Sequence, residues 1–249
     1  MQDKSALGRA LAMVRDLRVR CSWDRVQTRE SLRPYLVEEV FELDYALGEG
    51  DPAAIKEELS DLLLHLAFQL VIAEERGEFT AAVVADDLEA KMRRRHPHLF
   101  DLGEAEPWER IKRKERGGHT LAGIIPTLPP LLMAFRLQER AASVGFDWPD
   151  VAGPLAKVRE ELAEVEAELP GEGERLAEEI GDLFFAAVNL ARKAGVEPGT
   201  ALDRANRKFR DRFGALEQLA SARGIDVGTA GLEVLDGLWD EVKGRTLSP

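Results

Sequence analysis

Pairs of acidic residues with helical spacing recur on two neighbouring segments of the chain. Glu161 and Glu164 lie three residues apart on the first segment, and Glu179 and Asp182 have the same spacing on the second. Side chains three residues apart share one face of a helix. The sequence PGEG at 170–173 separates the two segments, so both pairs lie roughly 9 Å from this turn at about 1.5 Å per residue. We expect the four carboxylates to face one another if the helices pack antiparallel.

Four carboxylates at the edge of a helix core require compensation by protons or by a cation, because they repel one another and lose hydration. Little positive charge accompanies Glu161 and Glu164 on their own segment, and apolar residues 183–187 follow the second pair. Carboxylate ligands without Cys or His favour Mg²⁺, and Mn²⁺ can replace it. A single pair of this kind is more often a solvated surface, but the combined pattern predicts a divalent metal site.

The first half of the chain repeats the pattern of the second. Its corresponding acidic residues are Glu39, Glu42, Glu58 and Asp61, with the sequence GEGDP at 48–52 in place of the turn. Two basic residues and a tryptophan also recur, with Lys91, Arg95 and Trp108 corresponding to Lys208, Arg212 and Trp239. Such self-similarity is typical of a duplicated domain. We predict helical-bundle domains at 1–114 and 127–249, joined by a linker at 115–126 that contains Gly and Pro.

The elements that carry these residues are predicted to be helices almost throughout. Apolar residues recur every three or four positions, and no segment alternates with period two. The expected fold is therefore all-α. The predicted helices are 5–18, 28–47, 52–76, 79–95, 127–141, 152–168, 173–194, 198–221 and 230–243.

Composition restricts the class of protein. The chain has 249 residues, 45% hydrophobic and 32% charged, and a formal net charge of −12. This charge argues against binding of duplex nucleic acid, which needs a basic surface. Its longest apolar run is too short to span a bilayer. The single Cys21 excludes an internal disulfide, and with no secretory signal apparent we expect a cytoplasmic protein without a membrane partner.

Basic residues one helical turn apart predict contact with phosphate. Lys208 and Arg212 would present two cations along one face, and their recurrence as Lys91 and Arg95 after a matching acidic hairpin favours polyphosphate binding over a solvated helix end. Trp239 fits either a core position or stacking on a nucleobase.

A di-iron carboxylate bundle is the competing metal site. It needs Glu-x-x-His on two helices, and neither acidic hairpin has a His at those positions. His65 follows Asp61 by four residues, whereas Ala186 stands at the corresponding position of the second half. We interpret His65 as a core histidine or as a residue that orients a ligand.

The motifs resemble the MazG family of nucleoside triphosphate pyrophosphohydrolases. EExxE followed by ExxD occurs in both halves, and CSWDRVQT at 21–28, KMRRRHPHLF at 91–100, VGFDWPD at 144–150 and RANRKF at 204–209 are similar to the two-domain bacterial members. Ser22 stands where that family usually has Pro. The resemblance implies an all-α fold related to dimeric dUTPases, active sites at a subunit interface, and hydrolysis of nucleoside triphosphates to nucleoside monophosphates and pyrophosphate.

The resemblance also assigns roles to residues by motif position. Mg²⁺ would be held by Glu161, Glu164, Glu179 and Asp182. A water molecule would be oriented by Glu160 or Glu161, and the substrate would contact Asn206, Lys208, Arg212 and Trp239. Equivalent positions in the first half are Glu39, Glu42, Glu58, Asp61, Lys91, Arg95 and Trp108.

The second half is expected to dominate turnover. Asn206 lies two residues before Lys208, whereas Glu89 precedes Lys91 and would repel a triphosphate. Two alternatives remain open: a non-catalytic helical oligomer that binds nucleotides or partner proteins, and an α-helical phosphatase that removes one phosphate. An apolar stripe at Val37, Phe41, Leu63 and Phe68 is expected to stay exposed on a single hairpin, which supports a homodimer or a higher homo-oligomer.

Overall fold

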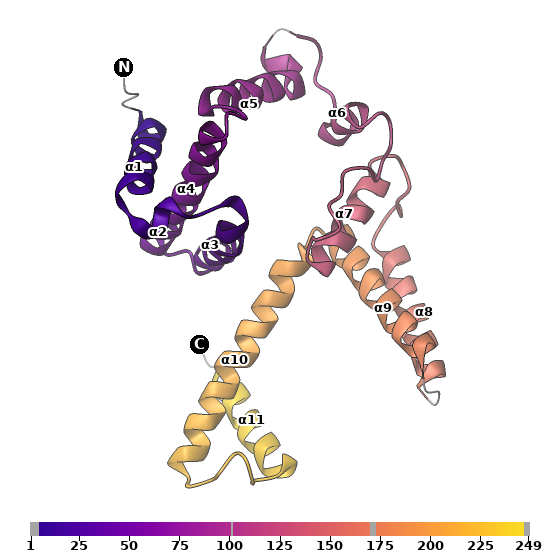
Figure 1. The fold of residues 1–249 in the computed structure, drawn as a ribbon. Helices are drawn as coiled ribbons and strands as arrows, with labels where there is room; N and C mark the ends of the chain where they lie inside the picture. Colours follow the sequence, from indigo (N-terminus) through magenta and orange to yellow (C-terminus); the bar gives the residue numbers. More distant parts are fainter. Residues whose placement is uncertain (1–4, 101, 170–172, 247–249) are drawn as a thin grey trace. The chain divides into compact units, whose positions relative to one another are not determined.

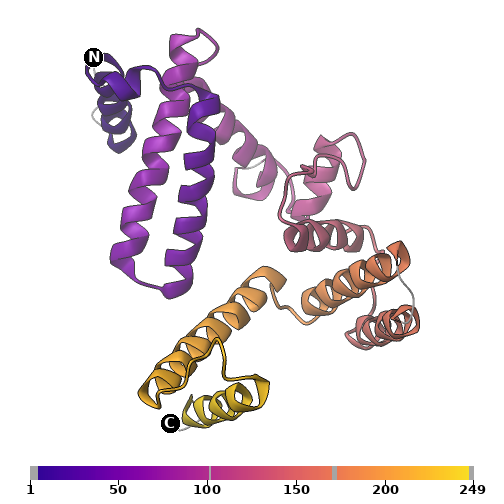
Figure 2. The same cartoon turned by 60° about the horizontal axis from the view of Figure 1, so that its bottom comes forward.

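The computed structural model describes residues 5–100, 102–169 and 173–246. Contacts divide the chain into two compact units, Met1–Glu106 and Pro107–Pro249. Every regular element among the described residues is a helix (Figures 1 and 2), which confirms the all-α fold. Within this part of the chain, no helix combines the length and the hydropathy needed to cross a membrane.

The helix bounds agree closely with the sequence pattern. The first unit contains α1 (Ala6–Arg20), α2 (Ser22–Arg25), α3 (Arg29–Glu49), α4 (Pro52–Glu75), α5 (Ala81–Arg95) and the 3₁₀ helix η1 (Pro97–Leu99). The second contains α6 (Trp108–Glu115), α7 (Pro130–Ala142), α8 (Ala152–Glu168), α9 (Glu174–Lys193), α10 (Pro198–Ala222) and α11 (Leu232–Thr246). All nine predicted helices are present. The short elements α2, η1 and α6 were not predicted, because one or two turns carry too few apolar residues to show a period.

Local sequence determines the turn between α3 and α4. Gly50 ends α3 with φ at 74°, a conformation that costs glycine little because it has no Cβ. Asp51 then caps α4 by accepting a hydrogen bond from the backbone N–H of Ala53, and Pro52 takes the first helical position. The chain therefore reverses direction between α3 and α4, at the predicted GEGDP break. In the second unit, the predicted turn residues 170–172 lie outside the described residues.

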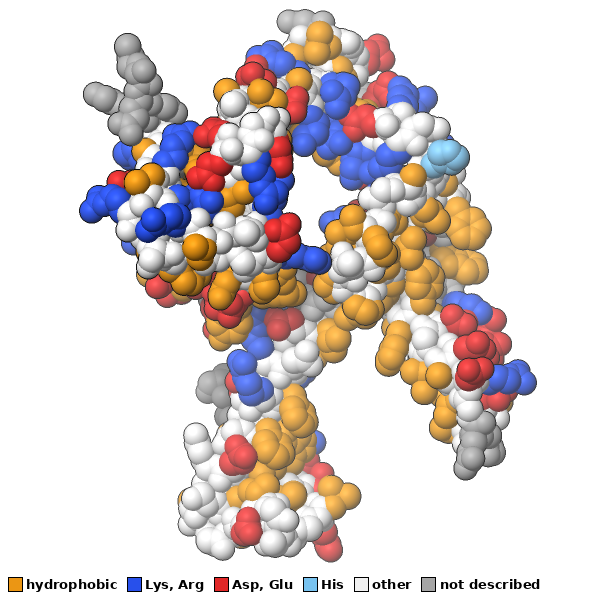
Figure 3. All heavy atoms as spheres, in the orientation of Figure 1, with side chains coloured by type: hydrophobic (Ala, Val, Ile, Leu, Met, Phe, Trp, Pro, Cys, Tyr) orange, Lys and Arg blue, Asp and Glu red, His pale blue; other side chains and the backbone are white. Residues whose placement is uncertain are grey.

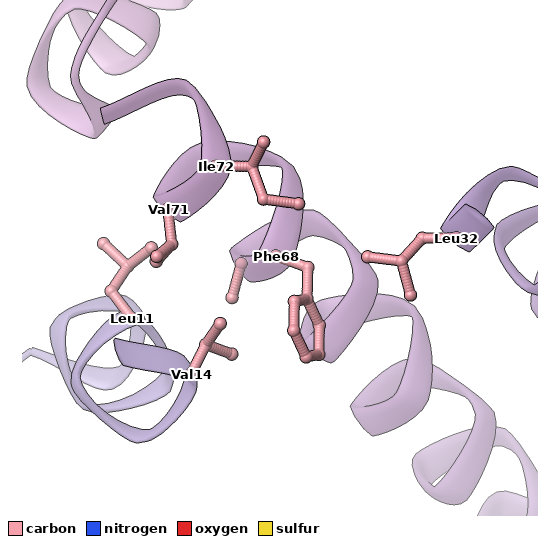
Figure 4. Packing of buried hydrophobic residues seen from close by; sticks show 7 residues of the cluster. Leu11, Val14, Leu32, Phe68, Val71 and Ile72 are labelled. Carbon is pink, nitrogen blue, oxygen red and sulfur yellow. The ribbon is translucent and has the colours of Figure 1, made fainter. Parts of the chain in front are cut away.

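The first unit has a core where α1, α3 and α4 meet. Its buried side chains include Leu11 and Val14 of α1, Leu32 of α3, and Phe68 and Val71 of α4 (Figure 4). Phe68 is only 2% exposed. The prediction that Phe68 belongs to an exposed apolar stripe is therefore wrong. Phe68 lies on the face of α4 that packs against α1 and α3.

The second unit is built on the antiparallel pair α8 and α9, with α7 packed on α9. Gln138 of α7 is buried and donates a hydrogen bond from Nε2 to the carbonyl oxygen of Phe185, at 2.8 Å. Helix α10 contacts α7 and α9, and it also pairs with α11 to form a second hairpin (Figure 2). Buried apolar residues hold this hairpin together: Leu216, Ala220, Leu238 and Val242.

The segment before α7 belongs to the second unit. Arg140 donates hydrogen bonds to the carbonyl oxygens of Leu121 and Ala122, at 3.3 and 2.7 Å, and so ties residues of the predicted linker to α7. The division at Glu106 falls inside the domain predicted at 1–114. In the structure, α6 and its Trp108 therefore lie in the second unit, and not with Lys91 and Arg95.

The element GFDW at 145–148 anchors the start of α8 to the end of α9. Asp147 forms ion pairs with Arg192 and with Lys193 at 3.0 Å. The hydrogen bond from Arg192, assisted by Lys193, lowers the pKa of Asp147 to about 2. The following Trp148 lies against Gly153, where an added Cβ would meet the indole ring at 2.4 Å.

We predict that Gly153→Ala destabilises the second unit by about 1–3 kcal/mol, because the rigid indole of Trp148 must shift to make room. Urea denaturation followed by tryptophan fluorescence measures this loss. Gly237→Ala is the matched control: Gly237 has open space around its Cβ position, so alanine should stabilise α11 by up to about 1 kcal/mol. Equal effects from the two substitutions would contradict the packing described.

We predict that Asp147→Asn lowers the free energy of unfolding at pH 7 by about 1–2 kcal/mol, because it removes the charge that Arg192 and Lys193 share. The pKa of Asp147 is depressed when folded, so its contribution is complete above the unfolded value near 3.9 and is lost as the pH falls toward about 2. Denaturation of both proteins from pH 7 to pH 2 should show curves that converge in acid. A difference that stays constant with pH would contradict the assignment.

Candidate metal centre

Three carboxylates of α8 and α9 converge in the second unit. Glu161, Glu179 and Asp182 each offer one oxygen, and these oxygens lie within 4.8 Å of one another. We call these residues the second trio. Glu161 is buried, at 4% exposure, while Glu179 is half-buried and Asp182 is exposed. The antiparallel packing of α8 on α9 thus brings the two predicted pairs together, as the spacing indicated.

Glu164 lies beside the second trio. Its carboxylate forms a separate group with Glu160 and Glu161, again with oxygens within 4.8 Å. Loss of hydration raises the pKa of Glu164, and so do a hydrogen bond and repulsion from Glu161 and repulsion from Glu179. The four predicted ligands therefore share one region of negative charge.

Lys157 supplies a positive charge to this region that the sequence analysis missed. Its ammonium lies 2.5 Å from Glu161 Oε1 and 2.8 Å from Glu160 Oε1, and these two carboxylates raise the pKa of Lys157. The expectation of little positive charge on this helix is therefore wrong. The signal was the i,i+4 spacing of Lys157 and Glu161, which places opposite charges one turn apart.

The first unit places the same three sequence positions together. Glu39 of α3 and Glu58 and Asp61 of α4 have carboxylate oxygens within 4.8 Å of one another, and we call them the first trio. The pKa values of Glu39 and Glu58 are raised. Loss of hydration is the larger cause, and repulsion from neighbouring carboxylates is the smaller one. Glu42 is not part of the first trio, but it lines a groove of about 760 Å³ together with Glu58 and Tyr45.

His65 lies beside Glu39 of the first trio. It is 7% exposed, and its Nε2 lies 3.7 Å from Glu39 Oε1. Burial lowers the pKa of His65, so the imidazole is neutral at pH 7. Both His65 Nδ1 and Glu39 Oε2 are buried without a hydrogen-bond partner.

The predicted phosphate-binding residues of the second half lie on α10. Asn206 and Lys208 are exposed, and Arg212 is half-buried. Neither Lys208 nor Arg212 forms an ion pair with an acidic residue that the structure describes, and the buried Nε of Arg212 has no hydrogen-bond partner. Trp239 packs on the α10–α11 core and contacts Phe209 with ring centroids 5.3 Å apart. The structure therefore brings the carboxylates together but does not join these cations to them.

In the first half, Lys91 and Arg95 lie half-buried on α5. Glu89, the residue expected to repel a triphosphate, forms an ion pair with Arg93 at 2.7 Å. Trp108 lies in the second unit, where it lines a cavity of about 660 Å³ together with Arg136 and Arg140.

Both trios fit a hard divalent cation. Each gathers carboxylate oxygens from two rigid helices, and the arrangement leaves negative charge that protons or a cation must offset. Glu39 Oε2 is moreover a buried oxygen that lacks a donor. Such a set of ligands can hold a metal that in turn binds phosphate oxygens.

Comparison with known proteins agrees with this geometry. The sequence model of the MazG nucleotide pyrophosphohydrolase domain matches residues 27–100, which include all of the first trio. The chain is also 45% identical over 231 residues to a nucleoside triphosphate pyrophosphohydrolase/pyrophosphatase MazG of Thermotoga maritima, covering 90% of this chain and 89% of that protein. The chain belongs to the MazG nucleotide pyrophosphohydrolase family.

Two further relatives match nearly the whole of this chain. A nucleoside triphosphate pyrophosphohydrolase of Escherichia coli K12 is 38% identical over 244 residues, covering 92% of this chain and 93% of that protein. An uncharacterised Bacillus subtilis protein, YabN, is 40% identical over 236 residues, but the match covers only 48% of its length. The MazG resemblance inferred from the motifs is thus confirmed over nearly the whole chain.

We predict that the metal-free protein becomes more stable as the pH falls from 7 toward 5. The pKa values of Glu39, Glu58 and Glu164 are raised in the folded state. Protonation therefore favours the folded state, and this gain is complete below the unfolded value and lost as the pH rises through the folded value. Thermal unfolding in a chelator at both pH values measures the effect.

The control for this prediction is the same experiment on Glu164→Gln, which carries no titrating group at that position. Its melting temperature at pH 7 should exceed that of the natural chain, and it should change less with pH. Addition of Mg²⁺ at pH 7 should raise the melting temperature of the natural chain. If the melting temperatures of the two proteins respond identically to pH and metal, the repulsion described does not limit stability.

Proposed function

We propose that the chain hydrolyses nucleoside triphosphates to nucleoside monophosphates and pyrophosphate with Mg²⁺, which Mn²⁺ can replace. The observation that carries the proposal is the convergence of Glu161, Glu179 and Asp182 on the packed helices α8 and α9. Membership of the MazG family supports the reaction, because relatives similar over nearly their whole length are named nucleoside triphosphate pyrophosphohydrolases. The substrate class and the pairing of products both follow from that name.

The second trio and Glu164 would hold the metal. Bound there, Mg²⁺ would offset the charge of the triphosphate and of the leaving pyrophosphate. Glu160 and Glu161 are the candidates for orienting the attacking water. Glu161 is buried and Glu160 is exposed, and both share the Lys157 ammonium. We favour Glu161, because a buried carboxylate next to the metal is held in a fixed orientation and has less competing solvent.

Lys208, Arg212 and Asn206 are proposed to bind the phosphates, and Trp239 the nucleotide. Lys208 forms no ion pair with a carboxylate of the described chain, and Arg212 keeps a buried donor without an acceptor, so both retain capacity for an anion. These groups lie on α10 and α11, and the trio lies on α8 and α9. Their joint use requires α10 of the same chain or of a second chain to approach the trio.

Assembly into a homodimer or a higher homo-oligomer is part of the proposal. Large apolar side chains remain exposed on the helices that carry both trios, among them Phe41 at 58% and Phe184 at 62%. Hydrophobic and acidic side chains share the exposed surface of the α8–α9 pair (Figure 3). Large apolar side chains exposed next to one another favour burial against further helices. We retain the cytoplasm as the proposed location, and the domain limits 1–114 and 127–249 for the duplicated units.

We predict that the chain incubated with nucleoside triphosphates and Mg²⁺ releases nucleoside monophosphate and pyrophosphate in equal amounts. Anion-exchange separation of the products measures this outcome, with a chelator as the metal-free control. Release of nucleoside diphosphate and phosphate would identify the phosphatase alternative. Tight nucleotide binding without turnover would support the non-catalytic oligomer.

We predict that the second half dominates turnover. Glu179→Gln should lower kcat/KM by at least about 100-fold, because it removes a metal ligand, whereas the matched Glu58→Gln of the first trio should lower it less than about threefold. Metal binding measured alongside turnover shows whether each variant has lost only its own site. Equal losses of activity from the two substitutions would contradict the asymmetry.

A further inference from the structure

The cavity of about 660 Å³ in the second unit is a candidate binding site in its own right. Its lining comes from α6, from α7 and from the segment 123–128 between them, and none of these lining residues belongs to either trio. Arg140 ties the chain just before this segment to α7 by hydrogen bonds to the carbonyl oxygens of Leu121 and Ala122. Pockets for small ligands enclose about 300–1,000 Å³, so the cavity is large enough for a nucleotide.

Part of the lining is aromatic and apolar. Trp108 of α6 is 40% exposed, so its indole retains surface on which a planar ring can stack. The ammonium of Lys112 lies 6.0 Å from the centre of this indole, which places a cation next to the stacking surface. The segment between the helices adds the aliphatic side chains Ile124, Ile125 and Leu128.

The rest of the lining carries an excess of positive charge. The charged residues among those that line the cavity are Lys112, Arg136, Arg140, Glu109 and Glu139. Arg116 joins them through an ion pair with Glu109, at 3.7 Å. These four cations and two carboxylates leave a formal charge of +2, although the whole chain has a net charge of −12. The cavity therefore favours an anion.

Neighbouring pKa values reflect this excess of positive charge. Loss of hydration and repulsion from Arg116 lower the pKa of Arg140. Loss of hydration alone would raise the pKa of Glu109, but the hydrogen bond from Lys112 and the charges around it lower that pKa. Among the residues that the structure describes, the acceptors of Arg140 are backbone carbonyls and not a carboxylate. A bound anion would relieve the repulsion between these cations.

We propose that this cavity binds a nucleoside monophosphate without a metal ion. Trp108 stacks on the base, and Lys112 and Arg140 bind the phosphate. A phosphate monoester carries about −1.5 to −2 charges at pH 7, which matches the formal charge of the cavity, whereas a triphosphate exceeds it. No group of three converging metal ligands in the described chain includes a residue of the cavity, so the phosphate meets these cations directly. Binding here does not depend on the proposed hydrolysis.

Equilibrium dialysis of the full-length protein with AMP, GMP, CMP and UMP tests this proposal. A chelator removes metal ions, and every protein carries Lys208→Gln and Arg212→Gln, so that the proposed phosphate-binding residues of α10 do not contribute. We expect one monophosphate per chain, with a dissociation constant below about 1 mM. Inorganic phosphate and the free nucleoside should each bind at least about tenfold more weakly, because each lacks one of the two contacts. If none of the four nucleotides binds in this range, the proposal is wrong.

Substitutions on α6 locate the bound nucleotide. Lys112→Gln should weaken its binding by about tenfold or more, whereas the matched Lys114→Gln, on the same helix but outside the lining, should change it by less than about twofold. Trp108→Leu should weaken binding of the monophosphate by about fivefold or more and leave binding of inorganic phosphate unchanged. Equal effects of the two lysine substitutions, or equal effects of Trp108→Leu on both ligands, would overturn the proposal.

Further controls keep these outcomes distinct from a failure of folding or of the proposed activity. Arg136→Gln removes a cation of the cavity from α7, where the side chain is 49% exposed, and should weaken binding of the monophosphate by about threefold or more. Circular dichroism and thermal unfolding verify that each variant is folded. Hydrolysis is measured separately on the chain with its natural Lys208 and Arg212, so its absence would refute the proposed reaction and leave this site intact.

Discussion

Repulsion among carboxylates held on facing helices is the constraint on which the two candidate sites depend. Antiparallel packing of α3 on α4, and of α8 on α9, brings three acidic side chains together in each unit. Helices of this length are stabilised mainly by their apolar faces, so the backbone cannot relax to separate the charges without losing that packing. A cation or shared protons must therefore compensate them. A MazG enzyme can use such a site because the uncompensated charge attracts a divalent metal.

The two units compensate this charge in different ways. In the second, the ammonium of Lys157 contacts Glu161 directly, so the metal-free site already carries one fixed cation. In the first, no ammonium takes this place: the buried His65 is neutral, and the pKa of Glu39 rises because burial removes its hydration and nearby carboxylates repel its charge. The two trios thus occupy corresponding sequence positions but have different charged neighbours.

Much of this structure could be predicted from sequence. The acidic spacing and the breaks at Gly50 and near Gly173 determined which helices pair, since periodicity and turn residues act locally. The burial of Phe68 and the ion pair of Lys157 could not be predicted with the same certainty, because both depend on which face of a helix meets a neighbour. The position of Lys208 relative to the trio depends on long-range contacts of α10, about which sequence spacing carries no information.

Anomalous X-ray diffraction from crystals grown with Mn²⁺ tests the central claim most directly, because it locates the metal without reference to activity. The account predicts one anomalous peak among Glu161, Glu179 and Asp182, and another among Glu39, Glu58 and Asp61. Peaks at other acidic side chains, or well-ordered trios that hold no metal at saturating Mn²⁺, would contradict it.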